Sequence, residues 1–253
     1  MIEINSLHKK YGQRTILKDI NLKIPKGKLV SLIGPNGAGK STLLSIIARL
    51  EKIDQGSVKL DGQELSHYAL SSFSTKLSFL KQQNSLDLKL KVAELIAFGR
   101  FPYSKGQLNP RDIEIVNEAM ERMNLSHLCD AFIDEISGGE RQRVFLAMII
   151  AQDTDYILLD EPLNNLDMKH AVEIMQIATR LVREFNKTVI MVVHDINFAA
   201  NYSDYMIGMK AGEIVFMDKT DSIMGEGILR SLFDIDFRII KDGSSLLCNY
   251  YKI

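Results

Sequence analysis

The sequence has few cysteines, almost no net charge and no long apolar run. Its two cysteines, Cys129 and Cys248, are far apart and belong to no C-x-x-C pair, so two reduced thiols are expected. The 31 Lys and Arg residues oppose 32 Asp and Glu residues, and the net charge of −1 gives no support for a nucleic-acid partner. No apolar run approaches the roughly 18 residues of a membrane span.

A signal peptide is also missing from the pattern, because the amino terminus lacks a basic stretch followed by an apolar one. We therefore expect a cytosolic protein that reaches a membrane only by docking on a membrane protein. The 253 residues, 46% of them hydrophobic and 25% charged, are typical of a globular chain. They suffice for one large domain, or for a domain with an inserted subdomain.

One strong motif is present, a phosphate loop. An apolar run at Leu29–Ile33 predicts a buried strand, Gly34–Ser41 matches G-x-x-x-x-G-K-[ST], and the residues from Thr42 onward predict a helix. Such a loop surrounds phosphate oxygens with backbone N–H groups, and the helix N-terminus adds partial positive charge. Lys40 can reach the β- and γ-phosphates, and the Ser41 hydroxyl can ligate Mg²⁺. The sequence therefore predicts that the chain binds a nucleoside triphosphate.

Two later strands end in polar residues suited to phosphate chemistry. The apolar strand Tyr156–Glu161 ends in two carboxylates, of which Asp160 is placed to hold Mg²⁺. Glu161 is expected on the other face of that strand, as a candidate to polarise the attacking water. His194 follows a β-branched strand at Thr188–Val193 and precedes a helix that Asp195 is expected to cap. If the two strands are parallel neighbours, this histidine lies at the same sheet edge as the carboxylates.

Three other patterns have structural as well as functional interpretations. Tyr11 is either a loop aromatic packed on the sheet or a face on which adenine stacks, and the sequence favours neither. Ser137–Glu140 fits a helix capping box, but its two glycines also leave backbone donors free for a phosphate; the tetrapeptide alone favours the cap. The remaining histidines are expected at the surface or in packing: His8, His67, His127 and His170.

The order of the patterns predicts an α/β fold, a phosphate-loop NTPase core with an antiparallel β subdomain and an inserted helical subdomain. The first 80 residues are mostly short strands. An amphipathic helix at Lys91–Phe98 is expected to stop at Gly99, and a second, capped by Asn109, to run to about Met123. A third is expected from Gly138, and a fourth, capped by Asp167, to run to about Phe185. We expect residues 1–82 and 148–253 to form the core and 83–147 the helical insertion. Beyond a hairpin at 207–216 the chain carries no motif.

Together these motifs resemble the ATP-binding cassette (ABC) transporter ATPases over essentially the whole chain. The resemblance rests on seven motifs in the family's order: adenine-stacking Tyr11, Walker A at Gly34–Thr42, loop glutamine Gln82, signature ISGGE at Ile136–Glu140, Walker B YILLDE, a D-loop ending at Asp167 and switch histidine His194. The chain departs from the family where Glu140 replaces the commoner Gln and PLNNLD replaces PTSALD. These departures affect the expected tuning of rates and leave the resemblance intact.

The resemblance implies a head-to-tail dimer of two copies of the chain, with two ATP molecules and their Mg²⁺ ions between them. The signature of one copy would cap the γ-phosphate held by Lys40 of the other, so that the cap and phosphate interpretations hold together. Glu161 would act as base, His194 would orient water and phosphate, and Gln82 would sense Mg²⁺. The implied nucleotide contacts are Tyr11, Gly34, Asn36, Gly37, Gly39, Lys40, Ser41, Thr42, Ser137, Gly138, Gly139 and Asp167, with Ser41, Gln82 and Asp160 around the metal.

Two segments most resemble the iron–siderophore importers for petrobactin or other ferric catecholates: VAELIAFGRFPYSKG and IIAQDTDYILLDEPLNNLDMKH. This implies an ATPase at the inner face of the cell membrane, bound to integral membrane permease subunits and serving, indirectly, an extracytoplasmic siderophore-binding protein. The short chain favours a stand-alone subunit without a regulatory domain. Its apolar docking surface is expected at Phe98, Phe101 and Tyr103, although ordinary packing explains these aromatics equally well.

The alternative from another class is the ABC-type ATPase of iron–sulfur cluster assembly, which has a similar length and an SGGE signature. ABC ATPases of translation or DNA repair fit less well, because their tandem cassettes, long coiled coils or zinc insertions are missing from this sequence.

Overall fold

The computed structural model describes residues 1–81, 89–164, 166–243 and 245–251. The chain forms two compact units, Met1–Tyr68 with Met175–Ile253, and Ala69–Ile174. The predicted helical insertion at 83–147 falls inside the second unit, and its own limits stay a prediction. Among the described residues, no helix is both long and apolar enough to cross a membrane.

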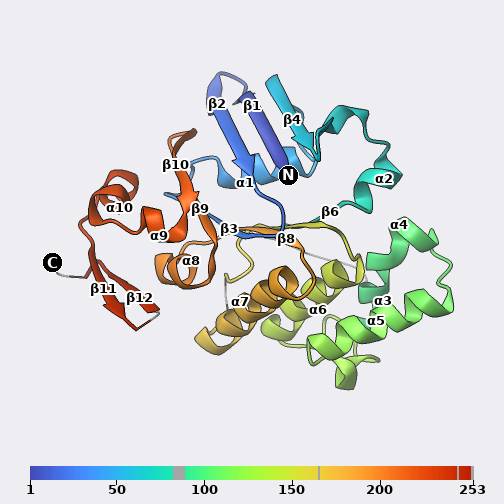
Figure 1. The fold of residues 1–253 in the computed structure, drawn as a ribbon. Helices are drawn as coiled ribbons and strands as arrows, with labels where there is room; N and C mark the ends of the chain where they lie inside the picture. The colour runs from blue at the N-terminus through green and yellow to red at the C-terminus, as the bar shows by residue number, and fades with distance from the viewer. Residues whose placement is uncertain (82–88, 165, 244, 252–253) are drawn as a thin grey trace. The chain divides into compact units, whose positions relative to one another are not determined.

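An antiparallel sheet occupies part of the first unit. Its strands are β1 (Ile2–Tyr11), β2 (Arg14–Ile24), β4 (Gln55–Leu60) and β5 (Gln63–Glu64), in the order β2-β1-β4-β5 (Figure 1). Side chains of β2 alternate between buried and exposed over its second half, as expected for a sheet with one face packed on a core. Tyr11 is the last residue of β1 and does not lie in the turn that follows.

Parallel strands form the second sheet region of the first unit. β8 (Thr188–Val192) and β9 (Tyr205–Lys210) both pair in parallel with β3 (Leu29–Ile33), and β10 (Glu213–Lys219) pairs antiparallel with β9. Every residue of β3 and β8 is buried, which explains their unbroken apolar sequences. Helix α1 (Lys40–Ile47) follows the phosphate loop after β3, as predicted.

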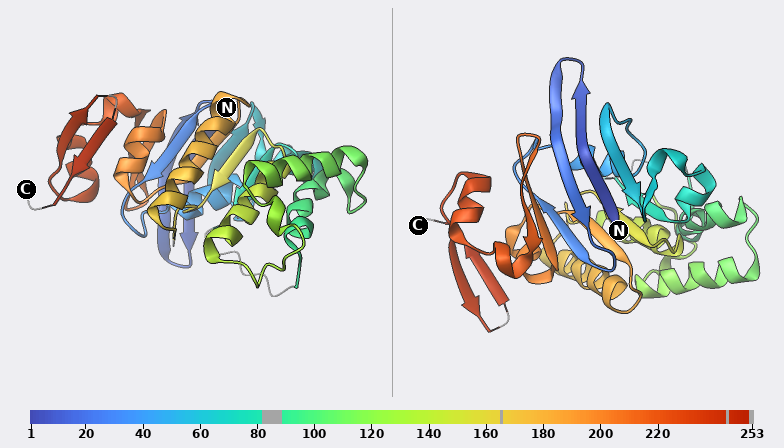
Figure 2. Two further views of the ribbon diagram at one scale, coloured as in Figure 1. Left: turned by 90° about the horizontal axis from the view of Figure 1, so that it is seen from below. Right: turned by 45° about the horizontal axis from the view of Figure 1, so that its top comes forward.

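The described residues after β10, which carry no recognised motif, form further helices and strands. These are α9 (Thr220–Ile223), α10 (Glu226–Phe233), β11 (Arg238–Asp242) and β12 (Ser245–Asn249), beside α8 (Ile196–Tyr202) (Figures 1 and 2). β11 and β12 pair antiparallel as a two-stranded sheet. One buried cluster joins α8, α9, α10 and this hairpin: Ile33, Ile196, Ala199, Ala200, Met206, Ile223, Leu229, Leu232, Phe237 and Cys248.

The second unit is mostly helical. It contains α2 (Leu70–Ser74), α3 (Val92–Ala97), α4 (Phe101–Ser104), α5 (Pro110–Arg122), α6 (Gly138–Ala151) and the first part of α7 (Met168–Arg183). Its two strands, β6 (Leu77–Leu80) and β7 (Tyr156–Leu159), pair in parallel. Short 3-10 helices lie at Leu65–His67 in the first unit, and at Phe98–Arg100 and Ser126–Leu128 in the second.

Gly99 differs from the sequence-based expectation. It lies inside the 3-10 helix that joins α3 to α4, so the helical path continues through it and the predicted helix end there is wrong. A Cβ atom at Gly99 would lie 2.2 Å from the Met148 carbonyl oxygen of α6. Glycine is therefore needed for a close helix–helix approach.

Candidate nucleotide site

The phosphate loop holds its lysine close to its own backbone. The Lys40 side chain is 5% exposed, and Nζ donates to the carbonyl oxygens of Gly34 at 2.8 Å and Pro35 at 3.0 Å. Asn36 and Gly37 are exposed at the tip, while Ser41 and Thr42 are half-buried at the start of α1. The loop thus presents backbone, an ammonium and two hydroxyls from one short segment, which is the donor set that a polyphosphate requires.

Two glycines of the loop are required by the packing around it. Gly34 has φ of +142°, and a Cβ there would lie 2.0 Å from the Met209 carbonyl oxygen of β9. Gly39 has φ of +101°, and its Cβ would lie 2.6 Å from Cδ2 of Leu17. Because both approaches and both angles exclude a side chain, the motif's first and last glycines are fixed by the fold as well as by phosphate chemistry.

Tyr11 lies next to the phosphate loop. Its ring is 47% exposed, and Lys9 Nζ lies 5.3 Å from the ring centroid. Partial burial, followed by the nearby Glu51 carboxylate, raises the pKa of the Tyr11 phenol, while a hydrogen bond with the Thr42 side chain lowers it. The structure therefore brings the aromatic candidate and the end of the Walker A motif together, with much of the ring open to solvent.

His194 lies at the same sheet edge as the phosphate loop. It follows β8, which is the parallel neighbour of β3, and Val193 N donates to Leu32 O at 3.2 Å just before it. The His194 side chain is exposed. Asp195 caps the helix behind it, as predicted, by accepting a hydrogen bond from Asn197 N at 2.8 Å.

The carboxylates of Walker B lie in the second unit. Asp160 is 3% exposed at the carboxyl end of β7, and its N–H donates to Leu80 O of β6 at 2.9 Å. Gln82, which follows β6 in the sequence, lies outside the described residues. β7 ends at Leu159, so strand alternation does not reach Glu161, and the expectation that it lies on the strand's other face is wrong. Glu161 is in a left-handed turn, with φ of +53°.

Two side-chain contacts stabilise the region around this turn. The Asn164 side-chain amide donates to Glu161 Oε2. Gln142, in the second turn of α6, donates to Pro162 O at 3.2 Å. The signature helix is therefore hydrogen-bonded to the loop that carries Glu161.

The signature tetrapeptide forms the predicted capping box. Glu140 N donates to Ser137 Oγ at 3.3 Å, and Ser137 N donates to Glu140 Oε2 at 2.9 Å. The Ser137 hydroxyl also donates to Glu140 Oε2, at 2.6 Å. This hydroxyl and the Ser137 N–H hold the pKa of Glu140 below its usual value. The structural interpretation of the motif is confirmed, whereas its phosphate contact stays a prediction.

His170 is a site-region residue that the sequence did not single out. Asp167 Oδ1 accepts a hydrogen bond from His170 N and lies 2.9 Å from His170 Nδ1, so the predicted Asp167 cap of α7 is present. The imidazole also faces the signature, because a Cβ on Gly139 would lie 3.6 Å from Nδ1. The available signal was its position three residues after a capping aspartate, but a lone histidine has no motif.

The oxygen ligands fit Mg²⁺. No group of three or more His, Cys, Asp or Glu side chains that could hold a metal occurs among the residues that the structure describes. The first unit offers the Ser41 hydroxyl, and the second unit, taken by itself, offers the Asp160 carboxylate. Mg²⁺ is commonly held by one or two carboxylates together with substrate phosphates and water, so a protein cage is not required.

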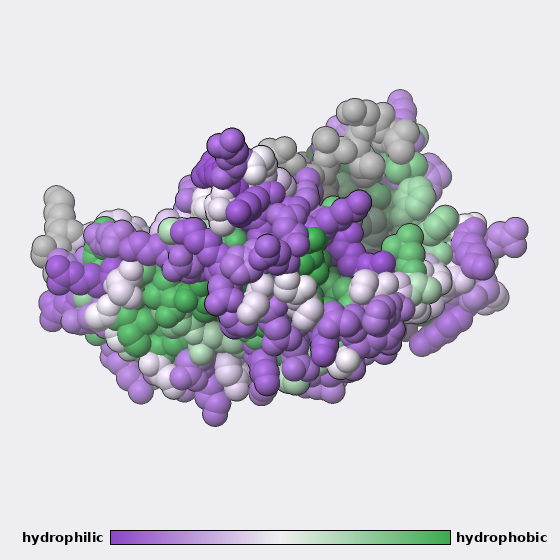
Figure 3. All heavy atoms as spheres, turned by 90° about the horizontal axis from the view of Figure 1, so that it is seen from above, coloured by the Kyte–Doolittle hydropathy of each residue, from purple (hydrophilic) through white to green (hydrophobic). Residues whose placement is uncertain are grey.

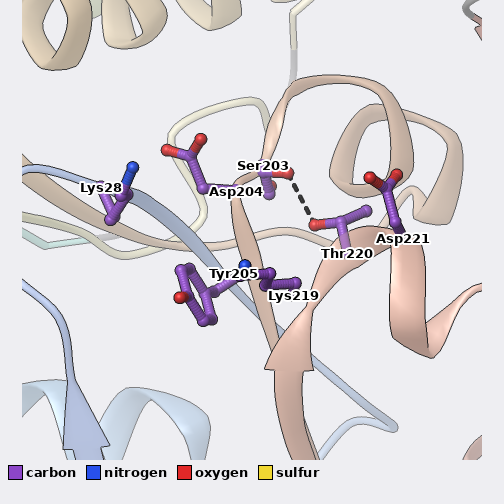
Figure 4. Close-up of a pocket in the computed structure, with 7 residues that line it drawn as sticks. All are labelled: Lys28, Ser203, Asp204, Tyr205, Lys219, Thr220 and Asp221. Carbon is purple, nitrogen blue, oxygen red and sulfur yellow. Dashed lines mark hydrogen bonds between the residues drawn. The ribbon is translucent and has the colours of Figure 1, made fainter.

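A separate hollow of about 250 Å³ in the first unit is lined by residues whose hydrogen bonds join neighbouring elements of the fold. It is lined by Lys28, Ser203, Asp204, Tyr205, Lys219, Thr220 and Asp221 (Figure 4). Thr220 Oγ1 donates to Ser203 O at 2.6 Å, and Asp204 accepts hydrogen bonds from Leu29 N at 2.9 Å and Arg183 at 2.7 Å. These bonds join the starts of β3 and β9 to α9, and none of the nucleotide motifs lies there.

Comparison with known proteins agrees with this architecture. Residues 17–164 match the ABC transporter family. The petrobactin import ATP-binding protein YclP of Bacillus subtilis is 48% identical over 94% of this chain and 95% of that protein. The iron(3+)-hydroxamate import ATP-binding protein FhuC of the same organism is 40% identical over 92% of this chain and 87% of its own.

A solved structure shows the same fold with reaction products. The dimeric cassette MJ0796, bound to ADP and Pi in a post-hydrolysis state, is 31% identical and covers 87% of this chain and 99% of its own, with a TM-score of 0.77. The α/β phosphate-loop fold predicted from the sequence is thereby confirmed. The chain belongs to the ABC transporter family, as one of its ATP-hydrolysing subunits.

Proposed function

We propose that this chain powers import of an iron–siderophore complex through a membrane permease, as a homodimeric ATPase on the inner face of the cell membrane. The observation that carries the proposal is the near full-length similarity to ATPases named for petrobactin and iron(3+)-hydroxamate import. The greater identity to the petrobactin protein favours a ferric catecholate. An extracytoplasmic binding protein would deliver the complex to the permease.

The proposed hydrolysis divides the work among the residues of the sequence motifs. Lys40 and the loop N–H groups bind the β- and γ-phosphates, and Tyr11 stacks on adenine. Glu161 accepts a proton from the water that attacks the γ-phosphorus, while His194 orients that water and the γ-phosphate. Ser41 and Asp160 would hold Mg²⁺ and Gln82 would sense it, and the ion would supply positive charge to the phosphate oxygens.

The second half of each site comes from a second copy of the chain. The N-terminus of α6, with Ser137, Gly138 and Gly139, would face the γ-phosphate of the other copy. Asp167, the last residue of the D-loop, would also contact the nucleotide. A helix of 14 residues supplies a partial positive charge and unsatisfied N–H groups at this end. ATP would then join the phosphate loop of one copy to the signature of the other.

The permease is proposed to dock in a groove of about 540 Å³ within the second unit. Phe98 and Phe101 line this groove with 51% and 56% of their surface exposed, beside Leu90 and Leu108. The hydrophobic surface of the molecule gathers in separate patches on an otherwise hydrophilic face (Figure 3), and exposed aromatic pairs of this kind suit an apolar helix.

Tyr103 is unlike the other two aromatics. Its ring lies 4.0 Å from the Arg100 guanidinium, and its hydroxyl donates to Gln152 O at 3.0 Å. Arg100 in turn donates to buried Asp112 at 2.9 Å and to Ala151 O at 2.8 Å. We assign Tyr103 mainly to packing of the helices, and Phe98 and Phe101 to the docking surface.

The transport proposal is tested by growth of a deletion strain under iron starvation with single purified siderophores. Growth on a ferric catecholate should be lost and should return with the wild-type chain but not with Glu161→Gln. Phe98→Ser with Phe101→Ser should fail in the same assay while the purified chain still hydrolyses ATP. Unimpaired uptake of every siderophore, together with defective iron–sulfur enzymes, would instead point to cluster assembly.

The shared site is tested by mixing two inactive chains, Lys40→Ala and Ser137→Arg. A mixed dimer contains one intact composite site, whereas each parent homodimer contains none. ATP-dependent pairing on size exclusion should therefore exceed that of either parent. A mixture that behaves as the plain average of its parents would argue against a signature that acts across the dimer.

A further inference from the structure

Two asparagines on α8 hold the edge of strand β12. Asn201 Nδ2 donates to Leu246 O at 2.7 Å, and Asn201 Oδ1 accepts from Leu246 N at 2.8 Å. One turn earlier, Asn197 Oδ1 accepts from Cys248 N at 2.7 Å. These three bonds, which we call the asparagine clamp, satisfy the outer edge of β12 as a neighbouring strand would.

The spacing of the clamp follows from the two backbone geometries. Four residues along a helix rise about 6 Å, and two residues along a strand span about 6.7 Å. Asn197 and Asn201 therefore meet alternate residues of β12, which point their backbone groups toward the same side. The register is as specific as that of a strand pair, although one partner is a helix.

The clamp fixes two elements that are weak by themselves. α8 has seven residues and the β11–β12 sheet has two strands, and neither length is stable alone in water. One face of α8 is buried through Ile196, Ala199 and Ala200. The clamp holds another part of its surface, so the position and rotation of α8 depend on the hairpin.

His194 lies two residues before the first residue of this helix. Asp195 caps α8 through Asn197 N, the residue whose side chain contacts Cys248. Ahead of the histidine, β8 is fixed by its pairing with β3. The His194 side chain therefore lies between a strand fixed by its pairing and a helix that the hairpin helps to hold in place.

We propose that the β11–β12 hairpin positions His194 for ATP hydrolysis, with Asn197 and Asn201 as the positioning residues. This inference rests on the proposed role of His194 in the site. His194, α8 and the hairpin all lie beyond the segment that matches the ABC transporter family, residues 17–164. Loosening the hairpin should slow the chemical step and leave nucleotide binding intact.

The test compares Asn201→Asp with Asn249→Asp in the full-length chain. Asn201→Asp replaces the amide that donates to Leu246 O, and to Asn197 O within α8, by an acceptor of the same shape. Asn249 lies on the same strand and accepts from Tyr251 N, a bond that Asp preserves. Per bound nucleotide, Asn201→Asp should lower kcat about three- to tenfold for each hydrogen bond lost, with KM for ATP unchanged. Asn249→Asp should match the wild type.

A second pair of variants guards against simple misfolding. Asn197→Asp keeps the acceptor for Cys248 N and should retain most of the rate, while Asn197→Ala removes it and should not. The NMR signal of the His194 ring, assigned by its loss in His194→Ala, should shift or broaden in Asn201→Asp and Asn197→Ala only. A loss of thermal stability with an unshifted His194 signal and unchanged kcat per bound nucleotide would overturn the proposal.

The same experiment distinguishes a failure of the proposed role of His194 from a failure of the proposed role of the clamp. If His194→Ala hydrolyses ATP at the wild-type rate, the proposed role of His194 fails, while the ring signal still reports whether the clamp positions it. If His194→Ala is inactive but Asn201→Asp has the wild-type rate and signal, the histidine's role stands and the clamp's role fails.

Discussion

The phosphate loop and the tail segment, defined as residues 220–243 and 245–251, lie in the same compact unit but are specified in different ways. The loop is encoded within Gly34–Thr42, where each functional residue type follows from local backbone and charge requirements. The tail segment carries no local motif, yet Phe237 and Cys248 are buried in one cluster with Ile196 of α8. Its structure is specified by contacts between distant residues.

Because of this difference, substitutions in the two regions should affect different properties of the protein. In the loop, chemistry and backbone geometry coincide, so single changes should affect nucleotide binding directly. In the tail segment, single changes should affect packing first and the reaction only through the elements that it holds. Paired substitutions in the two regions test this contrast.

The largest contrast is expected between two lysines that both donate to carbonyl oxygens at 2.8 Å. Lys40→Ala removes the ammonium held over the phosphate loop and should weaken ATP binding about 100-fold, since a hydrogen bond to a charged group contributes roughly 1.5–3 kcal/mol. Lys210→Ala removes contacts to Ser231 O and Asp234 and should leave ATP affinity unchanged. Isothermal titration measures both.

Lys210→Ala should also have little effect on the stability of the chain. The Lys210 pair is partly exposed, so its loss should cost less than about 1 kcal/mol of unfolding free energy. An equal loss of ATP affinity in the two variants would break the contrast between the regions.

Replacement of glycine by alanine should lower the stability of the chain at Gly34 and raise it at Gly227. Gly34→Ala places a Cβ 2.0 Å from Met209 O at a φ of +142°, and should destabilise the chain by on the order of 3 kcal/mol. Gly227, in the first turn of α10, has nothing within 4 Å of an added Cβ, so Gly227→Ala should stabilise by about 0.5 kcal/mol. Urea unfolding resolves both shifts, and destabilisation by Gly227→Ala would contradict the tail's ordinary helix geometry.

Sequence alone predicted those parts whose cause is local. The phosphate loop, the Asn109 and Asp195 caps and the signature capping box all depend on residues within a few positions of each other, and the structure confirms their geometry. Gly99 was misassigned because its reason is the Met148 carbonyl of another helix, which no local pattern reveals.

The remainder depended on contacts across the chain. The sequence predicts His170 only at the surface or in packing, because its place beside Gly139 arises only when α6 and α7 fold together. The tail segment was left without a role because Asn197 and Asn201 meet β12 some 50 residues later. The left-handed turn at Glu161 was missed because alternation was extended beyond the true end of β7.

A moderate effect is expected from the two cysteines, which report on the tail segment. Burial raises the pKa of the Cys248 thiol to about 11, with Asp195 adding to the shift, and its side chain is 1% exposed. At pH 8 the thiolate fraction is on the order of 0.001, so iodoacetamide should modify half-buried Cys129 well before Cys248. Mass spectrometry of digested peptides gives the two rates.

The cysteine measurement sharpens the contrast when the clamp is cut. Asn201→Asp should speed alkylation of Cys248, because opening of the hairpin exposes it, and should leave Cys129 unchanged. Equal labelling rates for the two thiols in the wild type would mean that the tail segment is loosely held.

The smallest effect is expected at Glu140, where a local capping motif belongs to the proposed site shared between two copies. The Ser137 hydroxyl and N–H hold the pKa of Glu140 below its usual value, so this carboxylate contributes stability above its unfolded-state pKa and loses it as pH falls through the lower folded-state pKa. Glu140→Gln keeps an acceptor for the capping box but removes the charge. It should cost about 0.5 kcal/mol at pH 7 and low salt, and flatten the stability profile below about pH 4.5.

In Glu140→Gln, ATP-dependent dimerisation should change in the opposite direction to the stability of the chain. In the wild type the Ser137 hydroxyl donates to the Glu140 carboxylate at 2.6 Å, which competes with a γ-phosphate for the same proton and places a negative charge near it. The neutral amide competes less, so ATP-dependent dimerisation should strengthen about two- to fivefold while stability falls slightly, since one weakened hydrogen bond is worth about 0.5–1 kcal/mol. Sedimentation with Glu161→Gln in both chains, which blocks hydrolysis, measures this affinity. Weaker dimerisation would show that the carboxylate assists the nucleotide-bound state, and that the capping box and the phosphate contact act together.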